Sequence, residues 1–195
     1  MSAPTNLGQL IIGNLVSPVS SEGEIFLYAV GNALELAWAT MEETLTFTVQ
    51  GSGDDWIVVF GGADFTDAFT GFGTTLYVSP FETATGAVLE LLGAIGVGVS
   101  DAFQTSMNTA AVQLDVEDEM ITGDHILDQI VTPPTTNEVS TMIIDNLGDP
   151  FVTPSLDGPK MVINAVSAAI VEAFAVWAAS VKLSGMMGGV GVSNV

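Results

Sequence analysis

The sequence predicts an α+β fold, with a small β-hairpin or sheet at about residues 44–79, several helices, and a long C-terminal apolar helix at about residues 160–183. Three observations predict this class. Apolar residues recur at helical spacing over residues 24–43, apolar and polar residues alternate in the segment TLTFTVQ, and a mostly apolar stretch lies between the chain's only two lysines. Together these patterns predict helices and strands in one chain.

The predicted helix at residues 24–43 is followed by a predicted hairpin. The apolar residues of this helix are spaced by three or four positions and share one side: Phe26, Val30, Ala33, Ala37 and Met41. In TLTFTVQ, Leu45, Phe47 and Val49 alternate with Thr and Gln, which is typical of a strand with one solvated face. The segments GSGDD and WIVVF complete a predicted hairpin over residues 44–60, and a third strand is expected at 74–79.

Glycine and proline divide the rest of the chain. A helix is predicted from about 82 to 92, the glycine-rich segment 93–100 is expected to end it, and another helix is predicted at 101–114. The predicted organisation is an α+β domain at 1–144, a Pro- and Asp-rich arm or linker at 145–159, an apolar assembly helix at 160–184 and a flexible glycine-rich tail at 185–195.

The apolar C-terminal helix carries a stripe of large side chains in helical phase, which we predict to be a subunit contact: Ile163, Val166, Ile170, Phe174, Trp177 and Val181. At about 1.5 Å per residue, residues 161–181 span roughly 30 Å, so length alone permits a core helix, a helix shared between subunits or a transmembrane span. A carboxylate near the bilayer centre costs roughly 2.5 to 3.5 kcal/mol. Because Glu172 lies there, we expect a helix buried in protein, with Glu172 at an edge or beside a polar partner.

The composition restricts the class of partner. Formal net charge is -21, and two lysines with no arginine cannot neutralise a phosphate backbone, which argues against nucleic-acid binding. Charged residues make up only 13%, whereas hydrophobic residues reach 48% and mean hydropathy is +0.53. A surface this poor in charge is expected to be partly covered by copies of the chain itself and by other subunits. The alternatives are a monomer whose surface is made of Thr, Ser, Asn and Gly, and, less favoured, a cover of lipid.

No motif for catalysis or for a bound cofactor is found in the sequence. Asp124, His125 and Asp128 are the candidate metal ligands, although two or three ligands from one helical turn would make a weak site, and a solvated acidic face is the favoured interpretation. The acidic run at 115–119 does not match a calcium loop. We therefore expect no catalytic residues and no resident cofactor, and at most loose Ca²⁺ or Mg²⁺ binding between subunits, where cations would relieve carboxylate repulsion.

The Pro-rich arm, the Ala-rich apolar helix and the glycine-rich tail over residues 145–195 resemble small structural proteins of tailed-phage virions. The resemblance implies a non-enzymatic structural subunit of a large assembly: a tail, neck, baseplate or minor capsid component. No Lys or Arg precedes Lys160, so the N-terminal segment lacks the basic region of a secretory signal, and we expect synthesis in the host cytoplasm without a signal peptide. The alternative is a membrane-embedded protein that uses residues 161–181 as a transmembrane span.

Overall fold

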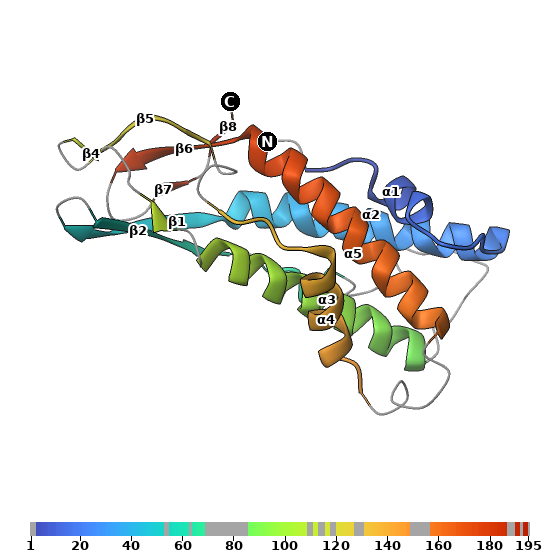
Figure 1. The fold of residues 1–195 in the computed structure, drawn as a ribbon. Coiled ribbons are helices and arrows are strands. Elements are labelled where there is room, and N and C mark those ends of the chain that lie inside the picture. Colours follow the sequence, from blue (N-terminus) through green and yellow to red (C-terminus); the bar gives the residue numbers. More distant parts are fainter. Residues whose placement is uncertain are drawn as a thin grey trace.

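The structure is a computed structural model. It describes residues 3–52, 55–62, 64–68, 86–108, 111–112, 116–117, 120–126, 131–148, 157–186, 190–191 and 193–194, and it describes side chains at 3–46, 60–62, 64–68, 86–108, 131–148 and 158–181. In these parts the helices are α1 (Leu7–Gly13), α2 (Ser21–Thr44), α3 (Gly86–Asn108), α4 (Thr136–Asp145) and α5 (Asp157–Ser180). Figure 1 shows α5 running across the molecule beside α1.

The prediction of an α+β fold is wrong. Among the residues with described side chains, 74% are helical, and the buried core is built almost entirely from helix residues. The alternating segment does form strands, but helices build the core: α3 is continuous where a break is expected, and α4 is not predicted. The protein is a mostly helical fold.

The strands pair at one end of the helices (Figure 1). One ladder has the order β3-β2-β1-β7, formed by Ala111–Val112, Asp55–Gly61, Thr46–Ser52 and Val190–Gly191. The other has the order β4-β5-β6-β8, formed by Val116–Glu117, Met120–Ile126, Val181–Met186 and Ser193–Asn194. Strands β1 and β2 are antiparallel where the hairpin is predicted, whereas the strand predicted at 74–79 lies outside the described residues.

The glycine-rich segment 93–100 does not end a helix, because α3 continues through it to Asn108. Its glycines allow close packing. A Cβ atom at Gly96 would lie 2.9 Å from the carbonyl oxygen of Phe65, and one at Gly98 would lie 2.6 Å from backbone atoms of Ile143 in α4. These glycines therefore lower helix propensity but let a loop and a second helix approach the backbone of α3.

Helix α4 is not predicted in the sequence analysis, although a local signal is present. The Thr135 hydroxyl accepts the Glu138 N–H at 3.2 Å, and the Glu138 carboxylate accepts the Thr135 N–H at 2.7 Å. This reciprocal pair is a capping box, which satisfies two backbone donors at the start of a helix. The pattern T-x-x-E directly before an apolar run could have located the helix.

The C-terminal helix begins at Asp157 and ends at Ser180, so Lys182 lies in β6 and not in the last helical turn. The predicted flexible tail at 185–195 stays a prediction, although some of its residues belong to strands. Within it, Val190–Gly191 pairs with β1, and Ser193–Asn194 pairs with β6. The chain therefore returns after α5 to both strand ladders.

Helices α1 and α2 cross at two glycines. A Cβ atom at Gly31 would overlap the backbone of Gly8, and the N–H of Leu7 donates to Oε1 of Glu35 at 2.6 Å. The carboxylate satisfies a backbone donor at the first turn of α1, where the helix has no internal acceptor. Burial raises the pKa of Glu35, and the hydrogen bond from Leu7 opposes that rise.

We predict that Gly98→Ala destabilises the fold, because the new methyl group would have to displace the backbone of Ile143. Overpacking of this kind costs typically about 1 to 3 kcal/mol. The matched control is Gly93→Ala in the same helix, where nothing lies within 4 Å, and helix propensity favours alanine by up to about 1 kcal/mol. Urea unfolding followed by circular dichroism measures both, and a similar effect of the two substitutions would contradict the close contact.

Candidate functional site

The six predicted contact residues of the C-terminal helix lie inside this chain. Ile163, Val166, Ile170, Phe174 and Val181 are fully buried, and Trp177 is 2% exposed. They pack in the chain's own core, with α5 against α1, α3 and α4. In this conformation the stripe is therefore not available to another subunit, and any intersubunit contact must use other side chains.

Five aromatic rings form the centre of that core: Trp38, Phe65, Phe103, Phe174 and Trp177. The Trp38 ring lies edge-on to Phe103, with centroids 4.9 Å apart, and edge-on to Trp177 at 5.7 Å. Phe103 also contacts Phe174 edge-on at 4.9 Å. Edge-to-face contacts stabilise the fold beyond the contribution from burial of apolar area, and they have a preferred geometry. The rings therefore hold α2, α3 and α5 together in a defined arrangement.

A buried carboxylate belongs to the same centre. The indole N–H of Trp177 donates to Oε1 of Glu42 at 2.6 Å, and Glu42 is only 8% exposed. Burial raises the pKa of Glu42, and the hydrogen bond from Trp177 partly opposes that rise by stabilising the anion. The pair joins α2 to α5 across 135 residues of sequence and is therefore a long-range tertiary contact of the core.

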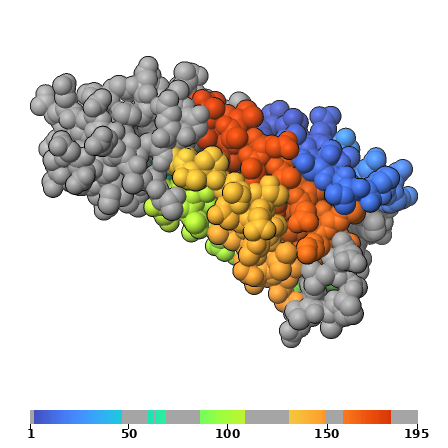
Figure 2. Space-filling model, viewed as in Figure 1, coloured from blue at the N-terminus to red at the C-terminus, as the bar shows by residue number. Residues whose placement is uncertain are grey.

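Glu172 lies on the opposite, exposed side of α5, as predicted. Its carboxylate accepts a hydrogen bond from Nδ2 of Asn14 at 3.2 Å. Figure 2 shows α5 exposed between the N-terminal helices and α4 on one face of the molecule. Beside Glu172, a groove of about 380 Å³ runs between residues 3–6 and α5, and it includes Val176, which is 75% exposed.

In the part of the chain that the structure describes, α3 and α5 are long and apolar enough to cross a membrane by length and composition. The apolar windows of both are 56% buried inside the chain, as expected for core helices of a compact protein. The face assignment predicted for α5 is confirmed, because its large apolar side chains point inward and Glu172 points out. These observations give the membrane alternative little support.

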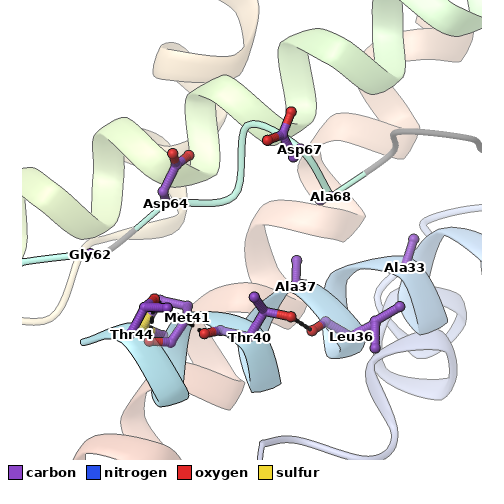
Figure 3. A pocket seen from close by; sticks show the side chains of 10 residues that line it. All are labelled: Ala33, Leu36, Ala37, Thr40, Met41, Thr44, Gly62, Asp64, Asp67 and Ala68. Atoms are coloured by element: carbon purple, nitrogen blue, oxygen red, sulfur yellow. Dashed lines mark hydrogen bonds between the residues drawn. The ribbon is translucent and has the colours of Figure 1, made fainter.

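A second groove, of about 330 Å³, lies between α2 and residues 62–68 (Figure 3). On the α2 side it is lined by apolar and hydroxyl side chains: Ala33, Leu36, Ala37, Thr40, Met41 and Thr44. Gly62 has φ +90, and a Cβ atom there would lie 2.6 Å from the Thr44 carbonyl oxygen. Glycine thus allows the chain to turn closely over the end of α2.

Asp64 and Asp67 line this groove on the side of the loop. Both carboxylates are directed away from α2 in Figure 3. Hydrogen bonds from Thr66 lower the pKa of Asp64, whose Oδ1 also accepts the Ser100 hydroxyl at 3.4 Å, while Ser100 accepts the Phe65 N–H at 2.5 Å. These hydrogen bonds anchor the loop at residues 64–66 to Ser100 of α3.

The candidate metal ligands are not assembled in the described structure. Asp124 and His125 belong to strand β5, so the helical spacing assumed for them is absent, and Asp128 lies outside the described residues. Within the described part of the chain, no group of three or more His, Cys, Asp or Glu side chains could hold a metal ion. Loose cation binding between subunits remains a prediction.

The exposed side of α2 is a surface that the sequence analysis did not identify. From Ile25 to Thr40 the exposed residues are Ile25, Tyr28, Asn32, Leu36 and Thr40, and we call this set the α2 outer stripe. Leu36 is 57% exposed, Ile25 48% and Tyr28 41%. The predicted apolar side of the helix is largely buried, because Val30, Ala33 and Met41 are at most 1% exposed. The buried side extends further around the helix to Leu27, Leu34 and Trp38, which are spaced by seven and four positions. That heptad-like spacing was the available signal.

No family model, curated protein or solved structure matches this chain. Its functional surfaces are therefore assigned from the packing, exposure and charge of its own residues. The α2 outer stripe and the adjoining groove, which share Leu36 and Thr40, form the candidate site.

We predict that Trp177→Ala lowers the free energy of unfolding by about 3 to 5 kcal/mol, as expected for removing a buried tryptophan. The substitution also removes the donor to the buried carboxylate of Glu42. Val176→Ala, one residue earlier and 75% exposed, is the control and should change stability by less than about 0.5 kcal/mol. Urea unfolding compares them, and similar losses for both would contradict the assignment of faces.

We also predict that Glu42→Gln weakens the pH dependence of stability. The folded pKa of Glu42 lies above its ordinary 4.5, so between these two values the folded state binds more protons than the unfolded state. Stability therefore falls as pH rises through the folded pKa, and glutamine removes this contribution while still accepting from Trp177. Thermal melts from pH 4.5 to neutral should show a smaller decline for the variant, and equal slopes would contradict it.

Proposed function

We propose that this chain is a non-enzymatic structural subunit of a large protein assembly, and that the assembly is a virion. The tailed-phage resemblance of residues 145–195 supports a place in a tail, neck, baseplate or minor capsid component. On this proposal the mature protein is located in the virion. Its partners are copies of itself and other subunits, with no nucleic acid and no resident cofactor.

The observation that carries the proposal is the apolar character of the α2 outer stripe. A surface helix usually presents charged and polar residues to water, opposite its buried side. In α2 the outward side instead carries Ile25, Tyr28 and Leu36, opposite buried Leu27, Leu34 and Trp38. Large apolar side chains exposed along one side of a helix, here on both sides of Asn32, are consistent with a surface that another molecule covers.

The charge of the chain favours a protein partner, and it disfavours a nucleic acid or an anionic membrane as the partner. Among the described side chains, Lys160 alone carries a formal positive charge. Carboxylates elsewhere on the surface keep the net charge at -21. Such a molecule is repelled by phosphate-rich surfaces and can approach protein through its uncharged regions.

The membrane-embedded alternative, with residues 161–181 as a span, has one observation in its favour, which is the length and apolar composition of α3 and α5. It would require the core described above to open, because the large side chains of α5 are buried against other helices. We therefore retain it only as an outcome of the experiment below.

Mass measurement in detergent-free solution, by sedimentation or light scattering over micromolar concentrations, tests the proposal. We expect a soluble species larger than one chain, whose mass increases with concentration because exposed apolar surface favours association. A stable monomer over the whole range would contradict the proposed function. Recovery of the chain only with detergent would favour the membrane alternative.

A further inference from the structure

We propose that the groove between residues 3–6 and α5 binds a basic segment of a different subunit, with a lysine or arginine of that subunit on Glu172. Apolar side chains on either side of the cation would contact Val176 and Leu10. This inference rests on the proposed function, because it names the chemistry of one neighbour in the assembly and the place where that neighbour binds. It uses a surface that shares no residue with the α2 outer stripe.

The groove is formed where the N-terminal segment runs along α5. Residues 3–6 and Leu10 line one wall, and the other wall is one side of α5: Glu172, Ala173, Val176, Trp177 and Ser180. Its volume of about 380 Å³ lies within the roughly 300 to 1,000 Å³ of pockets that hold ligands. Ala173 and Trp177 are buried and fixed by the core, so this part of the groove is already formed before a partner binds.

The surface around the groove is almost free of charge. Residues 3–21 contain no charged side chain, and between Met161 and Ser180 the one charged residue is Glu172. Figure 2 shows the N-terminal helices and α5 next to one another on one face of the molecule. A partner that covers these two segments therefore has a single ion, Glu172, to remove from water.

Glu172 determines which partner fits the groove. Its carboxylate accepts a hydrogen bond from Asn14, and no lysine among the described side chains pairs with it, since Lys160 lies about 18 Å away along α5. Covering this carboxylate with apolar atoms alone would leave a buried charge without a partner, which is strongly unfavourable. A subunit that fills the groove therefore has to supply a donor there, and a lysine or arginine also neutralises the charge.

Asn14 holds the carboxylate in position for such a contact. Its Nδ2 atom donates to the carbonyl oxygen of Leu10 at 2.9 Å and to Oε1 of Glu172 at 3.2 Å. The first bond fixes the amide to the end of α1, and the second orients the carboxylate without neutralising it. A group that is already oriented loses less conformational freedom when it binds.

Charge selects a basic subunit and disfavours a second copy as the occupant. The chain has two lysines and no arginine against 23 acidic residues, so two copies repel one another. A basic partner is instead attracted by the net charge of -21, which raises the rate of encounter. Val176, which is 75% exposed beside Glu172, then provides the apolar contact next to the ion pair.

Two matched peptides test the site on the full, isotope-labelled chain. The probes are acetyl-Leu-Arg-Leu-amide and acetyl-Leu-Gln-Leu-amide, which differ only in the central side chain, and binding is followed by the backbone amide resonances in NMR spectra. We expect the arginine peptide to shift the resonances of Ala173, Val176 and Ser180 in a saturable way. The glutamine peptide should bind about threefold to fivefold more weakly, as expected for loss of a partly exposed ion pair.

Variants of the chain assign the effect to one carboxylate. Glu172→Gln should reduce the affinity for the arginine peptide to that for the glutamine peptide. The control Glu24→Gln removes the same charge from an exposed position outside the groove and should leave the affinity unchanged. Val176→Lys places a cation one helical turn from Glu172 and should weaken binding of the arginine peptide by competing for the carboxylate. Circular dichroism verifies that the variants are folded.

Three results would overturn the proposed site. Equal losses for Glu172→Gln and Glu24→Gln would mean attraction by net charge alone. Shifts confined to other surfaces, or no saturable binding of either peptide, would mean that the groove does not take a basic segment. Loss of self-association in Val176→Lys, measured by sedimentation, would mean that the groove holds a second copy.

The same measurements separate this inference from the proposed function. If the chain associates in solution but the peptides give any of those three results, the basic-segment site fails and the structural-subunit function stands. If the chain is a stable monomer yet binds the arginine peptide through Glu172, the binding site stands and the proposed function fails.

Discussion

The contact between Trp177 and the helices around it is the interaction on which the rest of this fold depends. The indole ring contacts Trp38 of α2 and Phe103 of α3, and its N–H donates to the carboxylate of Glu42. The Trp177 side chain therefore makes both apolar contacts and a buried hydrogen bond. Since α5 also packs against α1 and α4, the position of every helix is defined relative to this ring.

Glycine has a second organising role, which is to let the elements approach closely. At Gly8, Gly31 and Gly98 the neighbouring backbone occupies the space where a side chain would lie. These positions lower the intrinsic helix propensity of α1, α2 and α3 but shorten the distance between helix axes. Such a fold obtains its stability from contact between helices more than from the helices themselves.

How much could be predicted from the sequence differs between elements. The C-terminal helix and its faces were predictable, because large apolar residues recur at helical spacing from Ile163 to Trp177. The charged residue Glu172 on the other side marks the exposed face. The continuity of α3 was not predictable, because its glycines have low helix propensity. Their presence is explained only by the close packing of Ile143 and Phe65 against the helix. Tertiary contacts of this kind have no signature within a short window of sequence.

The candidate site was missed for a related reason. A stripe of Ile25, Tyr28 and Leu36 has the same apolar composition as the core side of α2, and the sequence does not say which of two apolar sides is covered. The packing of α1 at Gly31 and of α5 at Trp38 decides it. Conversely, the apolar face of α5 was identified from the sequence, but it was predicted to contact another subunit. In the structure the chain's own helices cover it.

The distances in sequence between contacting elements imply an order of folding. The glycine crossing of α1 and α2 closes a short loop, with Gly8 and Gly31 in neighbouring helices, and costs little chain entropy. The hydrogen bond between Glu42 and Trp177 closes a loop of 135 residues. Contacts between residues so far apart in sequence slow folding. The N-terminal hairpin of helices is then formed early, with its core side open to solvent until α5 arrives. During that interval the nascent chain presents both apolar sides of α2, so a high local concentration of chains favours association before each has completed its own core.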